Sequence, residues 1–272
     1  MNYNPIVELV YNARSIATDR ALRDDVALKG EADFVTAVDT AISRFVKEGL
    51  ATLAPGSAFV TEEESHHSNA PDRFILDPID GTANLVRGYK KSSISLAHYK
   101  NGEILFGVVY DPFSGELFFA LKGKGAHYFD AANGIAPLLA IGVEHYTAEP
   151  LSVSALTHEN AIVEFGAGST NKSVSAESFE IGKEVFESCQ DLRRICSSAL
   201  AICYIAAGRI DGYFERRIKP WDYAAGVLIL QEAGGALSQW NGDPLPFDIP
   251  STIVAGNRDT YRYLHDVLKN RQ

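Results

Sequence analysis

The sequence has few cysteines, no long apolar run and no surplus of positive charge, and each deficit excludes a class of protein. Cys189, Cys196 and Cys203 are odd in number and form no CxxC pair. This argues against a disulfide framework or a zinc site, so we expect them to be packed on helical segments. No apolar stretch approaches the about 18 residues that a membrane span needs. The net charge of −10 disfavours a nucleic-acid backbone or an anionic membrane as the main partner.

The N-terminal segment MNYNPIVELVYNARS lacks the cationic start and the long apolar centre of a signal peptide, so we expect a cytoplasmic protein. Apolar residues make up 46% of the 272 residues and charged ones 22%, which is typical of a soluble globular protein with one large or two medium domains. A small anionic substrate is possible where a cation offsets the acidic field locally.

Helices followed by a largely antiparallel sheet are expected in the first half of the chain. Asn4 and Pro5 predict the N-cap and first position of a helix, and a second helical pattern runs from Val38 to Leu50. Asn101-Gly102, between β-rich runs, predicts a tight hairpin. Strands are expected at 57–64, 73–78, 92–100, 103–112 and 115–123.

Strand and helix patterns alternate in the second half. Strands are expected at 161–166, 211–215, 237–240 and 252–257, and helices at 178–189, 198–209, 222–233 and the C-terminal residues. Because the segment HYTAEP breaks the periodicity, we predict two parts, 1–147 and 148–272. The element order predicts an α/β fold (α+β layered), a sandwich whose two halves share layers, and periodicity alone leaves its topology open.

Three groups of carboxylates follow apolar residues at the ends of predicted elements. Glu62 begins an acidic run that follows the apolar pair at 59–60, Asp77 and Asp80 follow the run 74–76, and Asp222 opens a helix. Ligand sites of layered α/β proteins gather at such ends. Clustered carboxylates repel one another, so one takes up a proton or a cation sits between them, and magnesium suits carboxylates combined with a substrate phosphate.

The stretch Asp77-Pro-Ile-Asp80 predicts a turn that brings both aspartates and the Ile79 carbonyl toward one point, since Pro78 fixes its own φ and donates no hydrogen bond. Gly81 allows close approach of a ligand to the backbone. A short helix beginning at Thr82 would point free N–H groups at a phosphate. Each piece also has a plainer interpretation: a solvated glutamate run, a simple Asp-Pro or Asp-Gly turn, or an aspartate that only caps a helix.

Five segments, in order, resemble motifs of the inositol monophosphatase family. The first signature, DPxDGTxN, is matched by Asp77–Asn84, and the second, WDxAAGxxxxxEAGG, by Trp221–Gly235. Residues 33–39 resemble the DxVTxxD segment, 59–63 the FxGEE segment, and 206–215 the stretch that leads into the second signature. The resemblance implies an alternating αβαβα sandwich, commonly a homodimer, and lithium-sensitive, magnesium-dependent hydrolysis of a phosphomonoester.

The resemblance also implies two to three Mg²⁺ ions per active site. Glu62, Asp77 and the Ile79 carbonyl would hold one ion, and Asp77, Asp80 and Asp222 a second. Glu62 would face a third, weaker ion through water. Most of these ligands belong to the first predicted part of the chain, and Asp222 belongs to the second.

For the substrate, the resemblance implies backbone N–H donation to the phosphate from Gly81 and Thr82. Glu62, Asp39 and Thr82 would be catalytic, with Asp39 and Thr82 positioning the attacking water. The plainer interpretation of Asp39 is a helix cap, and that of the serine pair is the start of a helix. The residues expected to contact the alcohol part are Asp80, Ser197, Ser198 and Glu215.

The leading interpretation is hydrolysis of inositol 1-phosphate, and relatives leave histidinol phosphate, 3′-phosphoadenosine 5′-phosphate and fructose 1,6-bisphosphate as alternatives. Cys196 stands where the family has glycine, and Ala201 stands where it often has aspartate. Both positions are expected beside the alcohol part of the substrate, so the identity of the substrate stays undecided. Glu64 extends the acidic run, and Lys29 is matched to a family lysine near the active site. A non-catalytic regulatory protein that contacts transcription or translation machinery is the alternative of another class.

Overall fold

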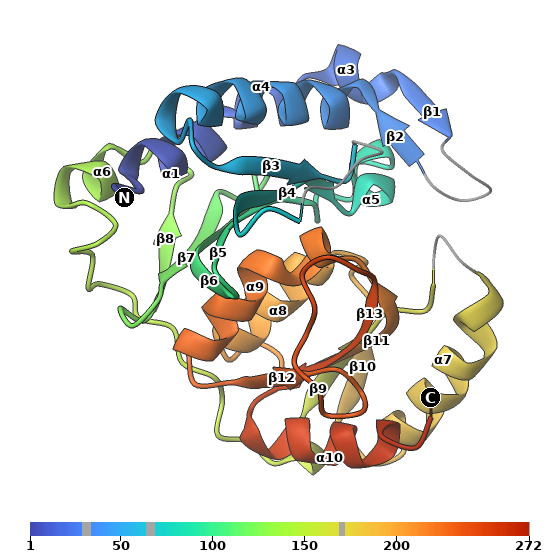
Figure 1. Cartoon of the computed structure of the whole chain (residues 1–272). Coiled ribbons are helices and arrows are strands. Elements are labelled where there is room, and N and C mark those ends of the chain that lie inside the picture. Colours follow the sequence, from blue (N-terminus) through green and yellow to red (C-terminus); the bar gives the residue numbers. More distant parts are fainter. Residues whose placement is uncertain (29–33, 64–68, 169–171, 272) are drawn as a thin grey trace.

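Alternating helical and sheet layers make up the structure, a computed structural model that describes residues 1–28, 34–63, 69–168 and 172–271 (Figure 1). A helical layer covers a six-stranded sheet, two central helices separate it from a five-stranded sheet, and two further helices close the other side. The predicted αβαβα sandwich is therefore confirmed. Lys29, Asp33 and Glu64, which belong to the predictions above, lie outside the described residues.

The first sheet has the strand order β3-β4-β5-β6-β7-β8 and is antiparallel except between β3 and β4. Asn101 and Gly102 both have positive φ, as the predicted tight hairpin between β5 and β6 requires. The strands are β3 (Ala58–Thr61), β4 (Asp72–Asp80), β5 (Ser93–Lys100), β6 (Glu103–Tyr110), β7 (Glu116–Leu121) and β8 (Ala126–Asp130).

The outer helical layer packs on the side of β4 that carries Phe74 and Leu76, whereas Ile75 belongs to the core on the other side. This alternation follows from the two-residue period of a strand. The prediction of Asn4 as N-cap is wrong. The cap is Tyr3, and the Asn4 side chain instead accepts from the Val143 N–H at 2.8 Å. The elements are α1 (Asn4–Asn12), α2 (Arg14–Ala17), α3 (Arg20–Asp24), the hairpin β1 (Val26–Leu28) and β2 (Phe34–Thr36), α4 (Ala37–Leu53), α5 (Thr82–Val86) and α6 (Ala136–Ile141).

The second sheet has the order β10-β9-β11-β13-β12 and mixes parallel and antiparallel pairs. Its outer face packs on two helices, α7 (Ser175–Phe186) and α10 (Arg258–Leu268). The strands are β9 (Ile162–Phe165), β10 (Asp191–Arg193), β11 (Gly212–Ile218), β12 (Ala236–Ser238) and β13 (Ser251–Gly256), and short 3₁₀ turns span His158–Asn160 and Lys172–Val174.

The central layer consists of α8 (Ser198–Ala206) and α9 (Pro220–Glu232), which are buried on nearly all sides between the two sheets. Such all-round burial explains their continuously apolar sequences. Both helices contact both sheets. The division at 147/148 therefore stays a prediction. Among the described residues, no helix is both long enough and apolar enough to cross a membrane.

Candidate metal and phosphate site

Asp77 and Asp80 lie at the end of β4, not in the predicted turn. The strand continues through Asp80, and its register with β5 shifts between the two aspartates, which marks a bulge. Pro78 is tolerated there because a bulge needs no ladder N–H at that position. The Asp77 carboxylate accepts the Ile79 N–H at 3.0 Å and so closes the bulge. The irregularity directs both carboxylates toward the same end of the sheet.

Asp222 reaches the same point from α9. The helix begins at Pro220, two residues before the predicted start, and Lys219 is its N-cap. Asp222 Oδ2 accepts the Lys219 N–H at 2.8 Å, so the carboxylate caps the helix as well as facing the site. Proline at the first helical position and an acid at the third are both favoured because this end of a helix has free N–H groups and a partial positive charge.

The carboxylates of Asp77, Asp80 and Asp222 form one cluster, since each offers an oxygen within 4.8 Å of the others. Burial, together with the charges of the neighbouring acids, raises the pKa of Asp77 and of Asp222 well above their usual values. Burial raises the pKa of Asp80 to about 6, although hydrogen bonds from Ser197, Ser198 and Ala199 oppose the shift. A divalent cation would relieve this repulsion, and an all-oxygen donor set suits Mg²⁺.

Glu62 stands beside this cluster because it directly follows β3, the parallel neighbour of β4. Thr61, the last residue of β3, pairs with Leu76, the residue before Asp77. Glu62 is half-buried, lines the same cavity, and is among the charges that raise the pKa values of Asp77 and Asp222. The ends of two adjacent strands thus supply acids to one point.

Asp39 and Thr82 are joined at the edge of the site. The Thr82 hydroxyl lies 3.3 Å from Asp39 Oδ1 and 3.1 Å from the Ile79 carbonyl oxygen. Asp39 also accepts the N–H and the hydroxyl of Thr36, at 2.8 and 2.6 Å, in a capping box at the start of α4. Asp39 is therefore a helix cap and a neighbour of Thr82 at once, and its predicted role with the attacking water stays a prediction.

Gly81 connects β4 to α5 in a conformation that favours glycine. Its φ is +91°, and a Cβ there would lie 3.0 Å from the Lys91 carbonyl oxygen and 3.1 Å from that of Cys196. Asn84 Nδ2 donates to the carbonyls of Lys91 and Ile195, each at 2.6 Å, and holds these loops against α5. The N-terminal end of α5 consequently faces the cavity beside the carboxylates.

The start of α8 provides the opposite wall. Asp80 accepts the Ser197 hydroxyl at 2.6 Å and the N–H groups of Ser198 and Ala199 at 3.2 and 2.7 Å. The Ser198 hydroxyl lies 2.8 Å from the Tyr213 hydroxyl and 3.4 Å from Glu215 Oε2. Ser197 therefore supports Asp80, whereas Ser198 and Glu215 form a polar wall beyond it.

One cavity of about 510 Å³ brings nearly all of the predicted residues together. Asp39 is the exception, since it does not line the cavity, and its carboxylate lies 3.3 Å from the hydroxyl of Thr82, which does. Sequence reasoning missed Glu164 and Tyr213, which also line it. An alternating pattern in 213–219 was the available signal for Tyr213. The predicted residues on its wall are Glu62, Asp77, Ile79, Asp80, Gly81, Thr82, Ser197, Ser198, Glu215 and Asp222.

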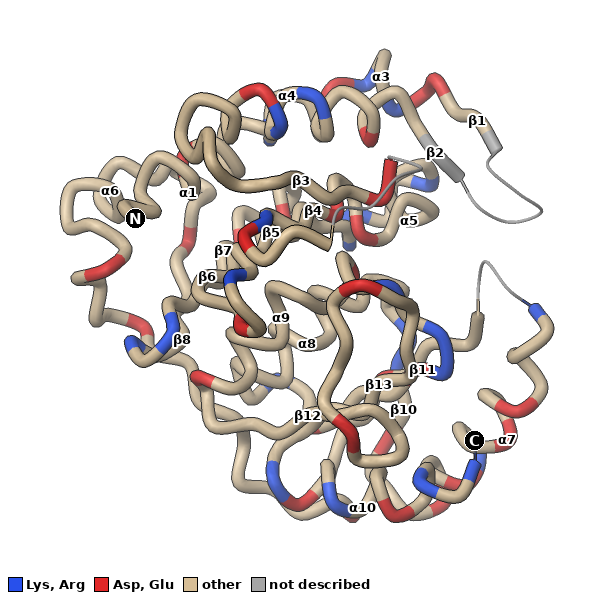
Figure 2. Tube along the Cα trace, viewed as in Figure 1, with Lys and Arg blue, Asp and Glu red and all other residues tan. Residues whose placement is uncertain are grey.

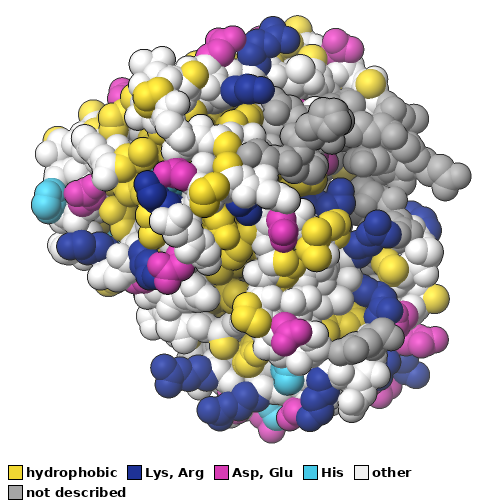
Figure 3. All heavy atoms as spheres, viewed as in Figure 1, with side chains coloured by type: hydrophobic (Ala, Val, Ile, Leu, Met, Phe, Trp, Pro, Cys, Tyr) yellow, Lys and Arg dark blue, Asp and Glu magenta, His cyan; other side chains and the backbone are white. Residues whose placement is uncertain are grey.

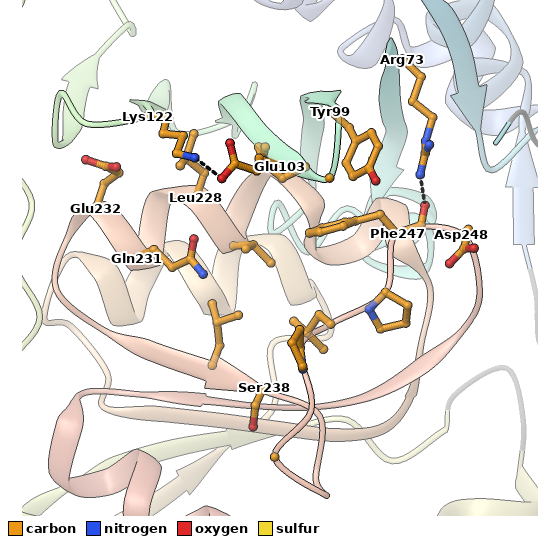
Figure 4. A pocket seen from close by; sticks show the side chains of 18 of the residues that line it. Arg73, Tyr99, Glu103, Lys122, Leu228, Gln231, Glu232, Ser238, Phe247 and Asp248 are labelled. Carbon is orange, nitrogen blue, oxygen red and sulfur yellow. Dashed lines mark hydrogen bonds and ion pairs between the residues drawn. The ribbon is translucent and has the colours of Figure 1, made fainter. Parts of the chain in front are cut away.

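A second, larger cavity of about 790 Å³ lies between the β5–β6 hairpin, α9 and the loop that contains Phe247 (Figure 4). Three of its charged side chains bind within the protein: Lys122 pairs with Glu103, and an Arg73 guanidinium nitrogen donates to the Phe247 carbonyl at 3.0 Å. Within the described residues, the cluster of candidate metal ligands belongs to the smaller cavity. We therefore assign the chemistry to the smaller cavity.

The geometry defines a class: a layered α/β protein with a buried acidic cluster, fit for a divalent cation, where strand and helix ends meet. The sequence profile of the Inositol monophosphatase family matches residues 4–272. The chain therefore belongs to this family of metal-dependent phosphomonoesterases, and the resemblance noted in the sequence is confirmed.

The similar proteins are named either as SuhB proteins or as inositol monophosphatases. The "Nus factor SuhB" of Pasteurella multocida is 34% identical over 248 residues, which cover 88% of this chain and 86% of that protein. The "Inositol-1-monophosphatase" of Rhizobium meliloti is 32% identical over 271 residues, which cover 98% and 95%. Among solved structures, the extragenic suppressor protein suhB of Bartonella henselae has a TM-score of 0.84 at 29% identity and covers 98% of this chain and 97% of its own.

Proposed function

We propose that the protein hydrolyses a small phosphomonoester with the help of Mg²⁺, with inositol 1-phosphate as the leading substrate. The observation that carries the proposal is the cluster of Asp77, Asp80 and Asp222, packed in one cavity with the N-terminal end of α5. Acids placed this closely suit cations, and helix N–H groups suit phosphate. The alternatives of histidinol phosphate, 3′-phosphoadenosine 5′-phosphate and fructose 1,6-bisphosphate use the same chemistry.

The residues present fit the proposed ions. Glu62, Asp77, the Ile79 carbonyl, Asp80 and Asp222 would hold Mg²⁺, which when bound offsets phosphate charge and lowers the pKa of water. These ligands come from the ends of β3 and β4 and from α9. The hydrogen bonds that Asp80 accepts from the start of α8 fix its carboxylate in a single orientation.

The remaining proposed roles belong to the walls of the cavity. Gly81 and Thr82 offer backbone N–H groups to the phosphate, and the linked Asp39 and Thr82 side chains orient the attacking water. Ser198 and Glu215 receive the hydroxyls of the alcohol part. The water oxygen bonds to phosphorus as the ester oxygen leaves and takes up a proton, so the products are the alcohol and inorganic phosphate. A homodimer and sensitivity to lithium are further parts of the proposal.

The test is release of phosphate from inositol 1-phosphate and from the alternative substrates, with Mg²⁺ or with EDTA. We expect Mg²⁺-dependent release that Asp80→Asn or Asp222→Asn nearly abolishes, while circular dichroism shows an intact fold. Undiminished activity in EDTA would overturn the metal mechanism, and near-normal turnover in either variant would remove that residue from the metal site.

A second candidate is a regulatory, non-catalytic binding role, because relatives that are 34% identical carry the name "Nus factor SuhB". The acidic cluster disfavours a purely non-catalytic protein, since all of the matched carboxylates are present. Stable capture of transcription or translation proteins, with negligible phosphate release from every substrate, would favour this second role over hydrolysis.

A further inference from the structure

The larger cavity has the size of a small-molecule site and apolar side chains on its walls. Its volume of about 790 Å³ lies within the range of roughly 300 to 1,000 Å³ that is usual for such sites. Hydrophobic side chains are visible on this face in Figure 3, and those that line the cavity include Leu228, Leu237, Leu245, Tyr99 and Phe247. Among the described residues, none lines both cavities, so the larger one is separate from the acidic cluster.

Arg73, which also lines the larger cavity, is a buried cation that forms no ion pair within the described residues. It is 4% exposed, and its terminal nitrogens donate to the Ala70 carbonyl at 2.7 Å and to the Phe247 carbonyl at 3.0 Å. Its Nε is buried and has no partner in the part of the chain that the structure describes. A guanidinium has five N–H donors, so with two in use three stay unpaired. Because buried polar groups are normally paired and a buried charge is costly without an opposite one, this arrangement indicates an anionic ligand.

Tyr99 holds this guanidinium in place and leaves its charge available. The Arg73 Cζ lies 4.0 Å from the centre of the Tyr99 ring, and an aromatic face stabilises a cation without neutralising it. The centre of the Phe247 ring lies 5.5 Å from that of the Tyr99 ring, and Figure 4 shows both rings beside Arg73. An aromatic ring of a ligand would find partners here for tilted or offset packing, directly next to the cation.

The other charges of the larger cavity favour a ligand with a single negative charge. Lys122 pairs with Glu103, and Glu232 accepts two backbone N–H groups of the β7–β8 turn. Asp248 is exposed, and its loop between β12 and β13 has acidic residues and no basic one (Figure 2). These acids would repel a phosphate dianion. A carboxylate carries one charge, and its two oxygens match the parallel N–H donors of Arg73.

We propose that the larger cavity binds a small aromatic monocarboxylate. The carboxylate pairs with Arg73, and the ring packs against the leucines of the walls and the Phe247 ring. A neutral aromatic molecule would leave the Arg73 charge without an anion, and a carboxylate without a ring would leave the apolar walls in contact with water. This ligand needs neither a phosphate nor a metal ion, so the inference does not rest on the proposed function.

The experiment measures the binding of phenylacetate, its neutral analogue phenylacetamide, and acetate by isothermal titration calorimetry without Mg²⁺. We expect the wild type to bind phenylacetate about tenfold or more tightly than either of the others, as for a charge-assisted hydrogen bond and a buried ring. Arg73→Met removes the charge and should weaken phenylacetate binding about tenfold. Gln231→Trp, at an exposed position of α9 on the cavity wall, should fill the cavity and abolish binding. The control Arg262→Met removes an exposed cation that lines neither cavity and should change nothing.

Three results would overturn the inference. The first is equal affinity for phenylacetate and phenylacetamide, and the second is no binding where a dissociation constant of about 1 mM would be detected. The third is binding that Gln231→Trp leaves intact, which would place the ligand elsewhere. Circular dichroism checks the fold of each variant, and the exposed Gln231 position decides the matter if Arg73→Met fails to fold. The assay contains neither Mg²⁺ nor a phosphorylated substrate, so its failure leaves the proposed function standing.

Discussion

At the scale of single residues, Glu164 is a buried acid that no predicted role absorbs. It lies in β9, is 3% exposed, and lines the cavity of the candidate site. Burial raises the pKa of its carboxyl from 4.5 to about 7, although the Ile195 N–H and the charges of Arg193 and Lys91 oppose the shift. The folded protein therefore keeps the Glu164 proton to a higher pH than the unfolded chain does.

Glu164→Gln should make stability less sensitive to pH. The pKa of the Glu164 carboxyl is higher in the folded protein than in the unfolded chain. The contribution of Glu164 to the free energy of unfolding is therefore fully present in the wild type below about pH 4.5, and it is lost as the pH rises through about 7. The glutamine variant stays neutral, so its free energy of unfolding relative to wild type should rise by about 3 kcal/mol across that window. Urea unfolding at pH 5 and at pH 8 measures this, and a difference that does not grow with pH would contradict it.

The residues of the candidate site were predictable to different degrees. The aspartates of the two signatures stand in recognisable local patterns, so the sequence alone was enough to predict which residues belong to the site. Glu164 could not be assigned, because the pairing of β9 with β11 brings it to the cavity, and no sequence pattern placed Arg217 on the same wall. Cys196 was seen to replace a family glycine, yet its φ of +58°, which favours glycine, is visible only in the structure. Cys189 and Cys196 both lie outside any helix, contrary to the expectation for the cysteines, whereas Cys203 lies in α8.

At the scale of elements, the close approach of α9 to β6 places Asp222. A Cβ on Gly107 of β6 would lie 2.6 Å from the Ala225 carbonyl oxygen, so only glycine fits there. Ala225 is one helical turn from Asp222. The glycine in β6 thus sets the depth at which α9 presents its carboxylate to the β4 aspartates.

Gly107→Ala should lower both stability and activity. The added methyl group pushes α9 away from the sheet, which we expect to cost about 1–3 kcal/mol of unfolding free energy and to reduce turnover by displacing Asp222. Thermal unfolding and phosphate release measure the two effects. Gly56→Ala is the matched control, because a Cβ at Gly56 has no described neighbour within 4 Å. Equal behaviour of the two variants would show that the contact does not position α9.

Elements with strong local signals were the predictable ones. The Asn101-Gly102 hairpin and the apolar segment that forms α8 correspond to the structure. The strands β1, β2, β8 and β10 were missed because they are short and depend on partners elsewhere in the chain. The predicted Asp77–Asp80 turn was wrong because pairing with β5 extends β4 through the proline as a bulge.

At the scale of the whole molecule, the candidate metal site joins parts of the fold that are distant in sequence. Asp77 and Asp80 belong to the first sheet, whereas Asp222 belongs to the central layer. Burial, and after it the charges of neighbouring acids, raise the pKa values of Asp77 and Asp222, so without a cation the ionised cluster is unfavourable. A bound cation would replace this repulsion by attraction, so it should stabilise the folded state as a whole.

Mg²⁺ should therefore raise the unfolding temperature of the protein relative to EDTA. At an Mg²⁺ concentration about 100 times the dissociation constant, linkage gives about 3 kcal/mol, or on the order of 5 °C for a chain of this size. Asp222→Asn should remove most of the shift, while its amide oxygen still accepts the Lys219 N–H that caps α9. The variant without metal should be at least as stable as the wild type at pH 8, since one buried charge is gone. Scanning calorimetry with KCl at matched ionic strength separates screening from binding, and an equal Mg²⁺ shift in both proteins would place the cation elsewhere.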